Sequence, residues 1–263
     1  MRPKRTSSTS KEKVYIYGKH ALMEALTSKP QVIRKVFLAH DAGDKELQAL
    51  LHEHAIPTVP LAASKGKELV GRDATHQGVI AIMDPSALLI SFDDFLKTLN
   101  PARNPAVAIL GEIHDPHNVG AIIRSAAAFG IAGVLIPKDR QAGVTGAVVK
   151  TSAGMAFRIP LIPIGNVNQT LRTLKNRGFW IYGLSGEGAN DLTKETFTEP
   201  SVFVVGNESK GIREKTEDLC DVMLRIPMHP RTESLNAAVS AAIVMYAWSA
   251  EHPEALKPES GRE

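Results

Sequence analysis

Short apolar segments alternate with helical segments through residues 106–252, and this alternation constrains the fold more than any other feature. The pattern predicts strands at 106–110, 133–136, 179–184, 201–205 and 222–226, and helices at 118–129, 167–177, 213–219 and 234–248. Short apolar strands that are joined by helices are typical of a mostly parallel sheet with helices on both faces. We therefore expect an α/β fold for this part of the chain. The helix at 234–248 is rich in alanine and apolar around most of its circumference, which predicts burial or contact with another subunit.

Residues 14–84 indicate a second, smaller α/β unit. Helices are predicted at 18–26 and 44–53, and strands at 32–39 and 78–83. A stretch at 85–105 contains three prolines and is expected to be a linker. Within it, Ser91 is expected to cap a short helix at 91–99, with Asp94 at the third helical position. The expected organisation is a tail at 1–13, a folded unit at 14–84, a linker at 85–105, a larger unit at 106–252 and a tail at 253–263.

The charge of the chain is concentrated at its N-terminus. The 263 residues carry a formal net charge of +3, and residues 1–13 alone hold five Lys or Arg and one Glu. The segments 14–84 and 106–252 each contain equal numbers of basic and acidic residues. The tail is therefore either a solvated disordered segment or a basic arm that adds nonspecific affinity for nucleic acid.

Several classes of protein are disfavoured. The chain has one cysteine, Cys220, so no intrachain disulfide forms, and a reducing cytoplasmic setting fits best. No apolar run is long enough for a membrane span, and no apolar stretch that would mark a secretory signal follows the basic N-terminus. The G-x-G-x-x-G, G-x-S-x-G and zinc-ligand patterns are missing, so we expect no dinucleotide loop, no serine hydrolase and no metal.

Three polar loops follow predicted strands, at 112–124, 206–211 and 227–236. Open α/β sheets bind ligands beyond the carboxyl ends of their strands, so these loops could converge on one site. The loop at 206–211 has the glycine spacing of a phosphate loop, but Ile212 and Arg213 stand where Lys and Ser or Thr are needed. Glu208 in that loop also disfavours a polyphosphate and favours a ligand with positive charge.

Each polar residue in these loops also has an ordinary structural explanation. Asn118 could cap a helix start, and Arg124 could form a structural salt bridge instead of contacting an anion or RNA. The glycines around Glu208 could serve a plain turn. Ser234 is expected to cap the last helix, which would place Asn236 in its first turn.

Together the three loops resemble the motifs of the SpoU/TrmH family of RNA 2′-O-ribose methyltransferases. The matching segments are DPHNVGAIIRSAAAFG (115–130), FVVGNESKGI (203–212) and RIPMHPRTESLNAAVSAA (225–242). The front segment resembles the RNA-binding domain of the family, which is similar to ribosomal protein L30e, through YGKHALMEAL (17–26) and HQGVIAI (76–82). With PKDR at 137–140, the layout most resembles the branch that methylates guanosine in large-subunit rRNA.

The resemblance implies a fold, an activity and an assembly. It implies a trefoil knot at the C-terminal end of the larger unit, a homodimer with its site near the subunit interface, and S-adenosylmethionine as methyl donor. The implied reaction is methylation of a ribose 2′-hydroxyl in rRNA, with tRNA as the alternative substrate. Two competing hypotheses are a non-catalytic RNA-binding or ribosome-assembly protein and a small-molecule methyltransferase.

The resemblance also implies roles for individual residues. The implied catalytic residues are Asn118, Arg124, Glu208, Ser234 and Asn236. The implied cofactor-binding residues are Leu184, Gly206, Ile226, Met228 and Leu235. The chain departs from the family pattern at Asn207, where a small residue is usual, and at Pro230, where many members have glycine.

Overall fold

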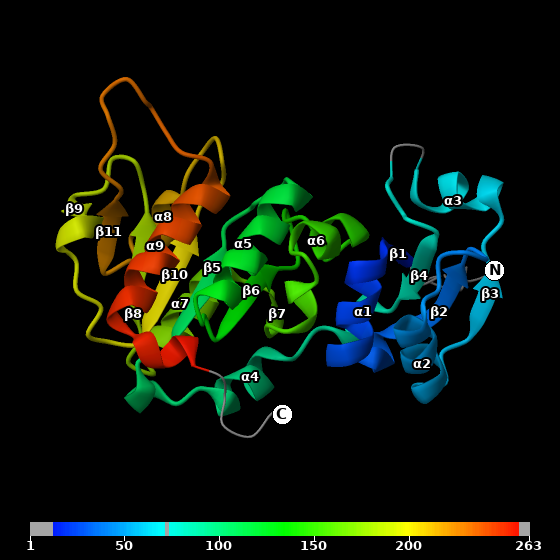
Figure 1. Ribbon diagram of the computed structural model, residues 1–263. Helices are drawn as coiled ribbons and strands as arrows, with labels where there is room; N and C mark the ends of the chain where they lie inside the picture. The colour runs from blue at the N-terminus through cyan, green and yellow to red at the C-terminus, as the bar shows by residue number, and fades with distance from the viewer. Residues whose placement is uncertain (1–12, 72–73, 258–263) are drawn as a thin grey trace, which may run out of the picture.

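The computed structural model describes residues 13–71 and 74–257 (Figure 1). The expected basic tail, apart from Lys13, and residues 258–263 of the C-terminal tail lie outside the described residues. Two sheets organise the described chain. The strands of the first are β1 (Val14–Tyr17), β2 (Ile33–Leu38), β3 (Thr58–Pro60) and β4 (Val79–Met83). The strands of the second are β5 (Ala106–Leu110), β6 (Gly133–Pro137), β7 (Leu161–Ile164), β8 (Trp180–Leu184), β9 (Asn190–Asp191), β10 (Ser201–Val205) and β11 (Val222–Arg225).

The larger sheet confirms the predicted parallel architecture. Its strand order is β7-β6-β5-β10-β8-β11-β9, and each neighbouring pair is parallel. The smaller sheet has the order β1-β4-β2-β3, in which β4 is antiparallel to β1 and β2. The helices are α1 (Lys19–Ser28), α2 (Lys45–Glu53), α3 (Ala63–Val70), α4 (Phe92–Thr98), α5 (Pro116–Ala128), α6 (Gly146–Thr151), α7 (Val167–Lys175), α8 (Glu214–Glu217) and α9 (Ala237–Glu251).

Strand β5 shows why helices cover both faces of the larger sheet. All five of its residues are buried, and successive side chains point to opposite faces. Ala108 and Leu110 join the core under α5, α6 and α9, whereas Val107 and Ile109 join the core under α4 and α7. Figure 1 shows α5 and α9 side by side over the sheet. An apolar strand without polar alternation is therefore explained by burial on both sides.

One predicted helix signal is confirmed, and a second helix ends at a glycine. The Ser91 hydroxyl accepts a hydrogen bond from the backbone N–H of Asp94 at 3.1 Å, so Ser91 is the N-cap of α4. Gly130 has a φ of 70° directly after the C-cap of α5, as expected for a glycine that ends a helix.

The predicted starts of two other helices are wrong. Helix α5 begins at Pro116 and is capped by Asp115, whose carboxylate accepts from the backbone N–H of His117 at 2.8 Å. Proline suits the first helical position because its missing N–H costs no helical hydrogen bond there. Asn118 therefore lies inside the first turn of α5. Helix α9 begins at Ala237, because the Asn236 side chain caps it by accepting from two backbone N–H groups. Ser234 lies outside this helix.

Among the α-helices and β-strands of the described residues, six short elements have no counterpart in the sequence prediction: β1, β3, β7, β9, α3 and α6. Strand β3 has three residues and β1 and β7 have four, so their patterns are too short to recognise. Each of these strands is stabilised by its neighbour in a sheet. Helix α6 has six residues and contains β-branched side chains that disfavour a helix locally.

The two sheets are in contact through α6, α1 and β1. Lys150 of α6 lies over the ring of Tyr17, 4.8 Å from its centroid. Gly146 approaches the smaller unit so closely that a Cβ atom there would lie 1.9 Å from the Tyr15 carbonyl oxygen. Arg158 forms a 2.6 Å ion pair with Glu24 of α1. Nothing within the described ranges is a helix long and apolar enough to cross a membrane.

Candidate active site

The three polar loops leave the larger sheet at the carboxyl ends of β5, β10 and β11. Strands β5 and β10 are direct neighbours, and β11 lies two positions beyond β10 in the sheet order. The first loop leads into α5, and the third leads into α9, which packs against α5. Parallel topology thus places residues that are distant in sequence at one edge, as the sequence predicted.

A chain of side-chain hydrogen bonds joins all three loops. The amide nitrogen of Asn236 donates to Oδ1 of Asn118 at 2.9 Å. The amide nitrogen of Asn118 in turn donates to Oε1 of Glu208 at 2.9 Å. Asn236 uses its own oxygen to cap α9, so only its NH₂ group is free to face Asn118. The helix cap therefore determines how the next amide is oriented, and that amide then presents its donor to the carboxylate.

Asn207 completes this chain and braces the second loop. Its amide nitrogen lies 3.3 Å from Oε2 of Glu208 and 2.8 Å from the carbonyl oxygen of Glu112. Its Oδ1 accepts from the backbone N–H groups of Ser209 and Lys210. In the sequence, Asn207 stood out only as a departure from the family pattern. The available signal was an asparagine at the start of a glycine-containing loop, where it often bonds to backbone groups nearby.

Glycines allow the second loop to close on itself. Asn207 and Gly211 exchange two backbone hydrogen bonds of 2.9 Å. A Cβ atom on Gly206 would lie 2.5 Å from the carbonyl carbon of Gly211, so only glycine fits there. Gly211 itself has a φ of 66°, which glycine adopts without strain. The loop is thus a built structure that holds Glu208 at its tip.

Two of the five predicted catalytic residues take no part in this chain of side-chain hydrogen bonds. Arg124 is exposed on α5, two residues beyond the buried Ile122, and no ion pair or hydrogen bond to it is found among the described residues. The structural salt bridge considered from the sequence is therefore not formed within residues 13–71 and 74–257. Ser234 is exposed on the third loop, close to the turn at 229–232 that Pro230 helps to form.

The predicted cofactor residues follow three strands that are neighbours in the sheet, β10, β8 and β11. Leu184 ends β8 opposite Leu224, and Ile226 directly follows β11. Both are half-buried against the core beneath α5 and α9, and Met228 and Leu235 are half-buried further along the third loop. Gly206 is buried at the end of β10. Half-buried apolar side chains beside close-packed backbone fit a ligand with an apolar ring that is held by backbone groups.

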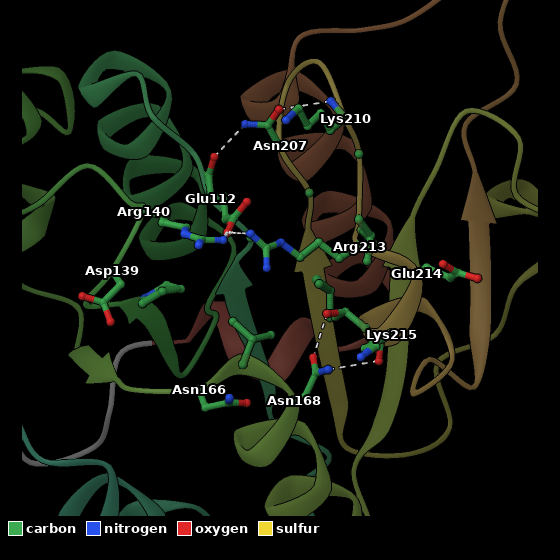
Figure 2. A pocket seen from close by; sticks show the side chains of 18 of the residues that line it. Glu112, Asp139, Arg140, Asn166, Asn168, Asn207, Lys210, Arg213, Glu214 and Lys215 are labelled. Atoms are coloured by element: carbon green, nitrogen blue, oxygen red, sulfur yellow. Dashed lines mark hydrogen bonds and ion pairs between the residues drawn. The ribbon is translucent and has the colours of Figure 1, made fainter.

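A cavity of about 670 Å³ adjoins this site on the other side of the second loop (Figure 2). Its walls come from the carboxyl ends of β5, β6, β7 and β10 and include Glu112, Arg140, Asn166, Asn207, Lys210 and Arg213. Asn207 therefore contacts both the cavity and the hydrogen-bonded chain. The cavity was not foreseen from the sequence, because β7 was not predicted.

The strongest pKa shifts occur away from the loops. Burial raises the pKa of the Cys220 thiol to about 12, and the nearby carboxylates of Glu217 and Asp221 add to the effect. Burial and the neighbouring Glu195 raise the pKa of the Tyr182 hydroxyl. Neither group is a candidate nucleophile or base. Over residues 13–71 and 74–257, no cluster of three or more His, Cys, Asp or Glu side chains is placed to hold a metal ion.

Two family models match the chain. Residues 105–246 match the SpoU rRNA methylase family, and residues 15–89 match the model for RNA 2′-O-ribose methyltransferase substrate binding. The 23S rRNA (guanosine-2′-O-)-methyltransferase RlmB of Photobacterium profundum is 36% identical over 88% of this chain and 95% of its own length. The protein of the same name from Neisseria meningitidis serogroup B is 34% identical over 88% of this chain and 92% of its own.

Solved structures share the fold. The SpoU methyltransferase AviRb from Streptomyces viridochromogenes, in complex with AdoMet, has a TM-score of 0.79 at 22% identity and covers 99% of this chain and 96% of its own. A TrmH-family protein from Porphyromonas gingivalis has a TM-score of 0.69 at 26% identity, with 90% and 89% covered. The parallel sheet with helices on both faces is the architecture that these proteins share.

Proposed function

Because the chain belongs to the SpoU rRNA methylase family, we propose that it methylates the ribose 2′-hydroxyl of a guanosine in 23S rRNA. The chain is an RNA 2′-O-ribose methyltransferase that uses S-adenosylmethionine. The observation that carries the choice of substrate is the 36% identity to a 23S rRNA guanosine methyltransferase over 95% of that relative. The smaller unit supports rRNA over tRNA, because this relative is matched through both units of the chain.

The chain of side-chain hydrogen bonds from Asn236 through Asn118 to Glu208 supports an active enzyme over a non-catalytic assembly protein. When bound, S-adenosylmethionine supplies a methyl group that is already activated as a sulfonium. The protein must therefore align the ribose hydroxyl and increase its nucleophilicity. Glu208 is held by amide donors from Asn118 and Asn207, so its carboxylate is prepositioned to accept a hydrogen bond from the ribose. Asn236 orients Asn118, and we propose Ser234 as a further contact from the third loop.

Arg124 has two candidate roles. A guanidinium normally stays protonated, so a role as proton acceptor is demanding. In the milder alternative, Arg124 binds the adjacent phosphate and stabilises the developing alkoxide, and the proton leaves elsewhere. Its exposed, unpaired state in the described chain supports the second role, because the guanidinium is free to bind an anion.

For the cofactor, we propose a site made by Gly206, Ile226 and Leu235, with Leu184 and Met228 on neighbouring loops. The backbone of the second loop would hold the polar parts, because Gly206 leaves no room for a side chain there. The half-buried leucines and isoleucine would cover the adenine ring.

We also propose a trefoil knot at the C-terminal end of the larger unit. The position of β11 between β8 and β9, followed by the return of the chain to α9 against α5, supports it.

A homodimer is also proposed, through the exposed face of α5 and α9. Val239 and Tyr246 on α9 are 46% and 62% exposed, which is unusual for large apolar side chains. A shallow apolar depression on this face is also lined by Asn118 and Asn236. A second copy on this face would therefore lie beside the candidate active site. We expect the substitution Tyr246→Glu to dissociate the dimer, which light scattering would measure.

We also propose the division of the chain into units that the sequence predicts. We propose an RNA-binding unit at 14–84 that is similar to ribosomal protein L30e, a linker at 85–105 and a catalytic unit at 106–252. The boundaries of the two matched family models support this division. The proposed tails at 1–13 and 253–263 flank these units. We propose that the protein acts in the cytoplasm, where bacterial ribosomes are assembled.

Mapping of 2′-O-methyl groups in rRNA tests the proposed substrate. Cells that lack this protein should lose one 2′-O-methylguanosine from 23S rRNA, and expression of the wild-type chain should restore it. An unchanged rRNA map together with the loss of one tRNA methylation would transfer the proposal to tRNA.

A further inference from the structure

The cavity of about 670 Å³ beside the second loop has no role in the function proposed above. Its volume is in the range of small-molecule sites and exceeds what a single ordered water needs. It lies at the carboxyl ends of β5, β6, β7 and β10, whereas the proposed cofactor residues follow β8, β10 and β11. The two sites therefore share β10 and its loop, where Gly206 lines the cavity and is also a proposed cofactor residue, and from there they extend in opposite directions along the same sheet edge.

Two arginines from different loops converge in this cavity. Arg140 Nη1 lies 3.9 Å from Oε1 of Glu112, and Arg213 donates through Nη2 to the same oxygen. Figure 2 shows their guanidinium groups approaching Glu112 from two directions. The two side chains remain 69% and 57% exposed. Each guanidinium carries five N–H donors, so most of these donors remain free for an anion such as a phosphate.

The backbone around this pair is strained. Glu112 has a φ of 63° and Arg140 a φ of 55°, in the left-handed region that residues other than glycine rarely adopt. Strained residues persist where the surrounding structure holds them, and they concentrate at binding sites. Arg140 also ends the PKDR segment at 137–140. Both partners of one ion pair are thus held in an unfavourable backbone conformation at the cavity wall.

The remaining lining groups suit a nucleotide. Lys210 and Lys215 add two cations, and Asp139 and Glu214 add two carboxylates, so basic groups outnumber acidic ones by one in the cavity. Asn166 uses its oxygen to cap α7, which leaves its NH₂ group available as a donor. Cationic groups for a phosphate beside amide and carboxylate groups for a base edge are the chemistry that recognises an RNA nucleotide.

We propose that this cavity holds a nucleotide of the RNA substrate adjacent to the methylated one, with Arg140 and Arg213 on its phosphate. The inference rests on the proposed RNA methylation. Asn207 links the two sites, because its amide contacts both the Glu112 carbonyl oxygen at the cavity wall and the Glu208 carboxylate. A nucleotide seated in the cavity would therefore fix the position of its neighbour relative to Glu208.

Charge-neutral variants of the arginines test the inference. Enzyme with Arg140→Gln or Arg213→Gln is assayed on a 23S rRNA fragment that the wild type methylates, with S-adenosylmethionine at saturation. We expect each variant to raise the KM for RNA by roughly tenfold. The slope of the logarithm of RNA affinity against the logarithm of salt concentration should become shallower by about one. The Kd for S-adenosylmethionine should not change. Arg103→Gln is the matched control, because Arg103 is exposed just before β5, at the opposite edge of the sheet.

Glu112→Gln separates RNA binding from support of the loops. Removal of this carboxylate frees both guanidinium groups, so the inference expects an unchanged or lower KM for RNA. An increase in KM equal to that of the arginine variants would mean that the cluster only braces the loops, and would overturn the inference. If the wild type methylates the fragment and the arginine variants behave like Arg103→Gln, the cavity inference alone fails. If the wild type methylates no RNA, the proposed function fails with it.

Discussion

Asn118 and Glu208 lie 90 positions apart in the chain, and the amide nitrogen of one donates to the carboxylate of the other at 2.9 Å. This hydrogen bond joins the first turn of α5 to the tip of the loop that follows β10. It exists because β5 and β10 are paired in the sheet and because Asn236 orients the Asn118 amide from the start of α9. The geometry of the site therefore depends on a helix cap as well as on the loops.

Substitutions of Asn236 should separate stability from catalysis. Asn236→Ala removes the cap of α9 and should cost about 1 kcal/mol of folding free energy. Asn236→Asp keeps an oxygen that can cap the helix but loses the donor to Asn118. We expect Asn236→Asp to unfold close to the wild-type denaturant midpoint and to lose at least about tenfold in single-turnover rate. Wild-type turnover by Asn236→Asp would show that the orientation of Asn118 is unimportant.

Substitutions of Arg124 address the mechanism. Because Arg124 is exposed and unpaired in the described chain, Arg124→Ala and Arg124→Lys should each change the folding free energy by less than about 0.5 kcal/mol. Both should slow methyl transfer, since Lys keeps the charge but loses the planar fork. Single-turnover rates at saturating cofactor and RNA measure this. Near-normal rates for both variants would exclude the proton-acceptor role and the phosphate-binding role alike.

Gly206→Ala should disrupt the second loop. The added Cβ would lie 2.5 Å from the Gly211 carbonyl carbon and 2.6 Å from the Ile212 nitrogen, and neither backbone atom can move independently. We expect the Kd for S-adenosylmethionine, measured by calorimetry, to rise by at least about tenfold. Gly143→Ala is the control, because a Cβ there would meet nothing within 4 Å. Equal cofactor affinity in the two variants would remove the second loop from the cofactor site.

Cys220 provides a test by pH. Burial raises the pKa of its thiol from 9.0 to about 12, so the folded state retains the proton where the unfolded state has lost it. Its contribution to stability is therefore complete below pH 9 and declines as the pH rises from 9 toward 12. At about pH 8 we expect iodoacetamide to modify the native thiol far more slowly than the thiol in denaturant. Equal rates in the two states would show that the fold does not shield the Cys220 thiol.

An element could be predicted from the sequence where its local residue pattern agrees with the environment that the element has in the fold. Strand β5 and the Ser91 cap could be predicted, because an apolar run and a capping sequence act over a few residues. Strands β1 and β7 could not, because their stability comes from neighbours that are distant in sequence. The cap of α9 was predicted at Ser234, whereas Asn236 caps the helix. Both residue types are good caps, and the hydrogen bond of Asn236 to Asn118 depends on tertiary structure.

The candidate site was foreseen in part for the same reason. The loops around Glu208 and Asn118 were identified because polar residues there follow apolar strands. Asn207 was missed as a bracing residue, because its bond to the Glu112 carbonyl oxygen spans 95 positions. The cavity wall at Asn166 was missed because it depends on β7, which was not predicted, although the start of α7 was predicted at the right residue.

Glu208 and its amide partners are proposed to serve ribose methylation of a guanosine in 23S rRNA. The decisive experiment is methyl transfer from labelled S-adenosylmethionine to 23S rRNA by purified wild-type protein and by Glu208→Gln, followed by mapping of the modified nucleotide. We expect one 2′-O-methylguanosine with the wild type, and at least about a tenfold slower single-turnover rate with Glu208→Gln at unchanged RNA binding. Methylation on a base instead of a ribose, or full activity in Glu208→Gln, would refute this role.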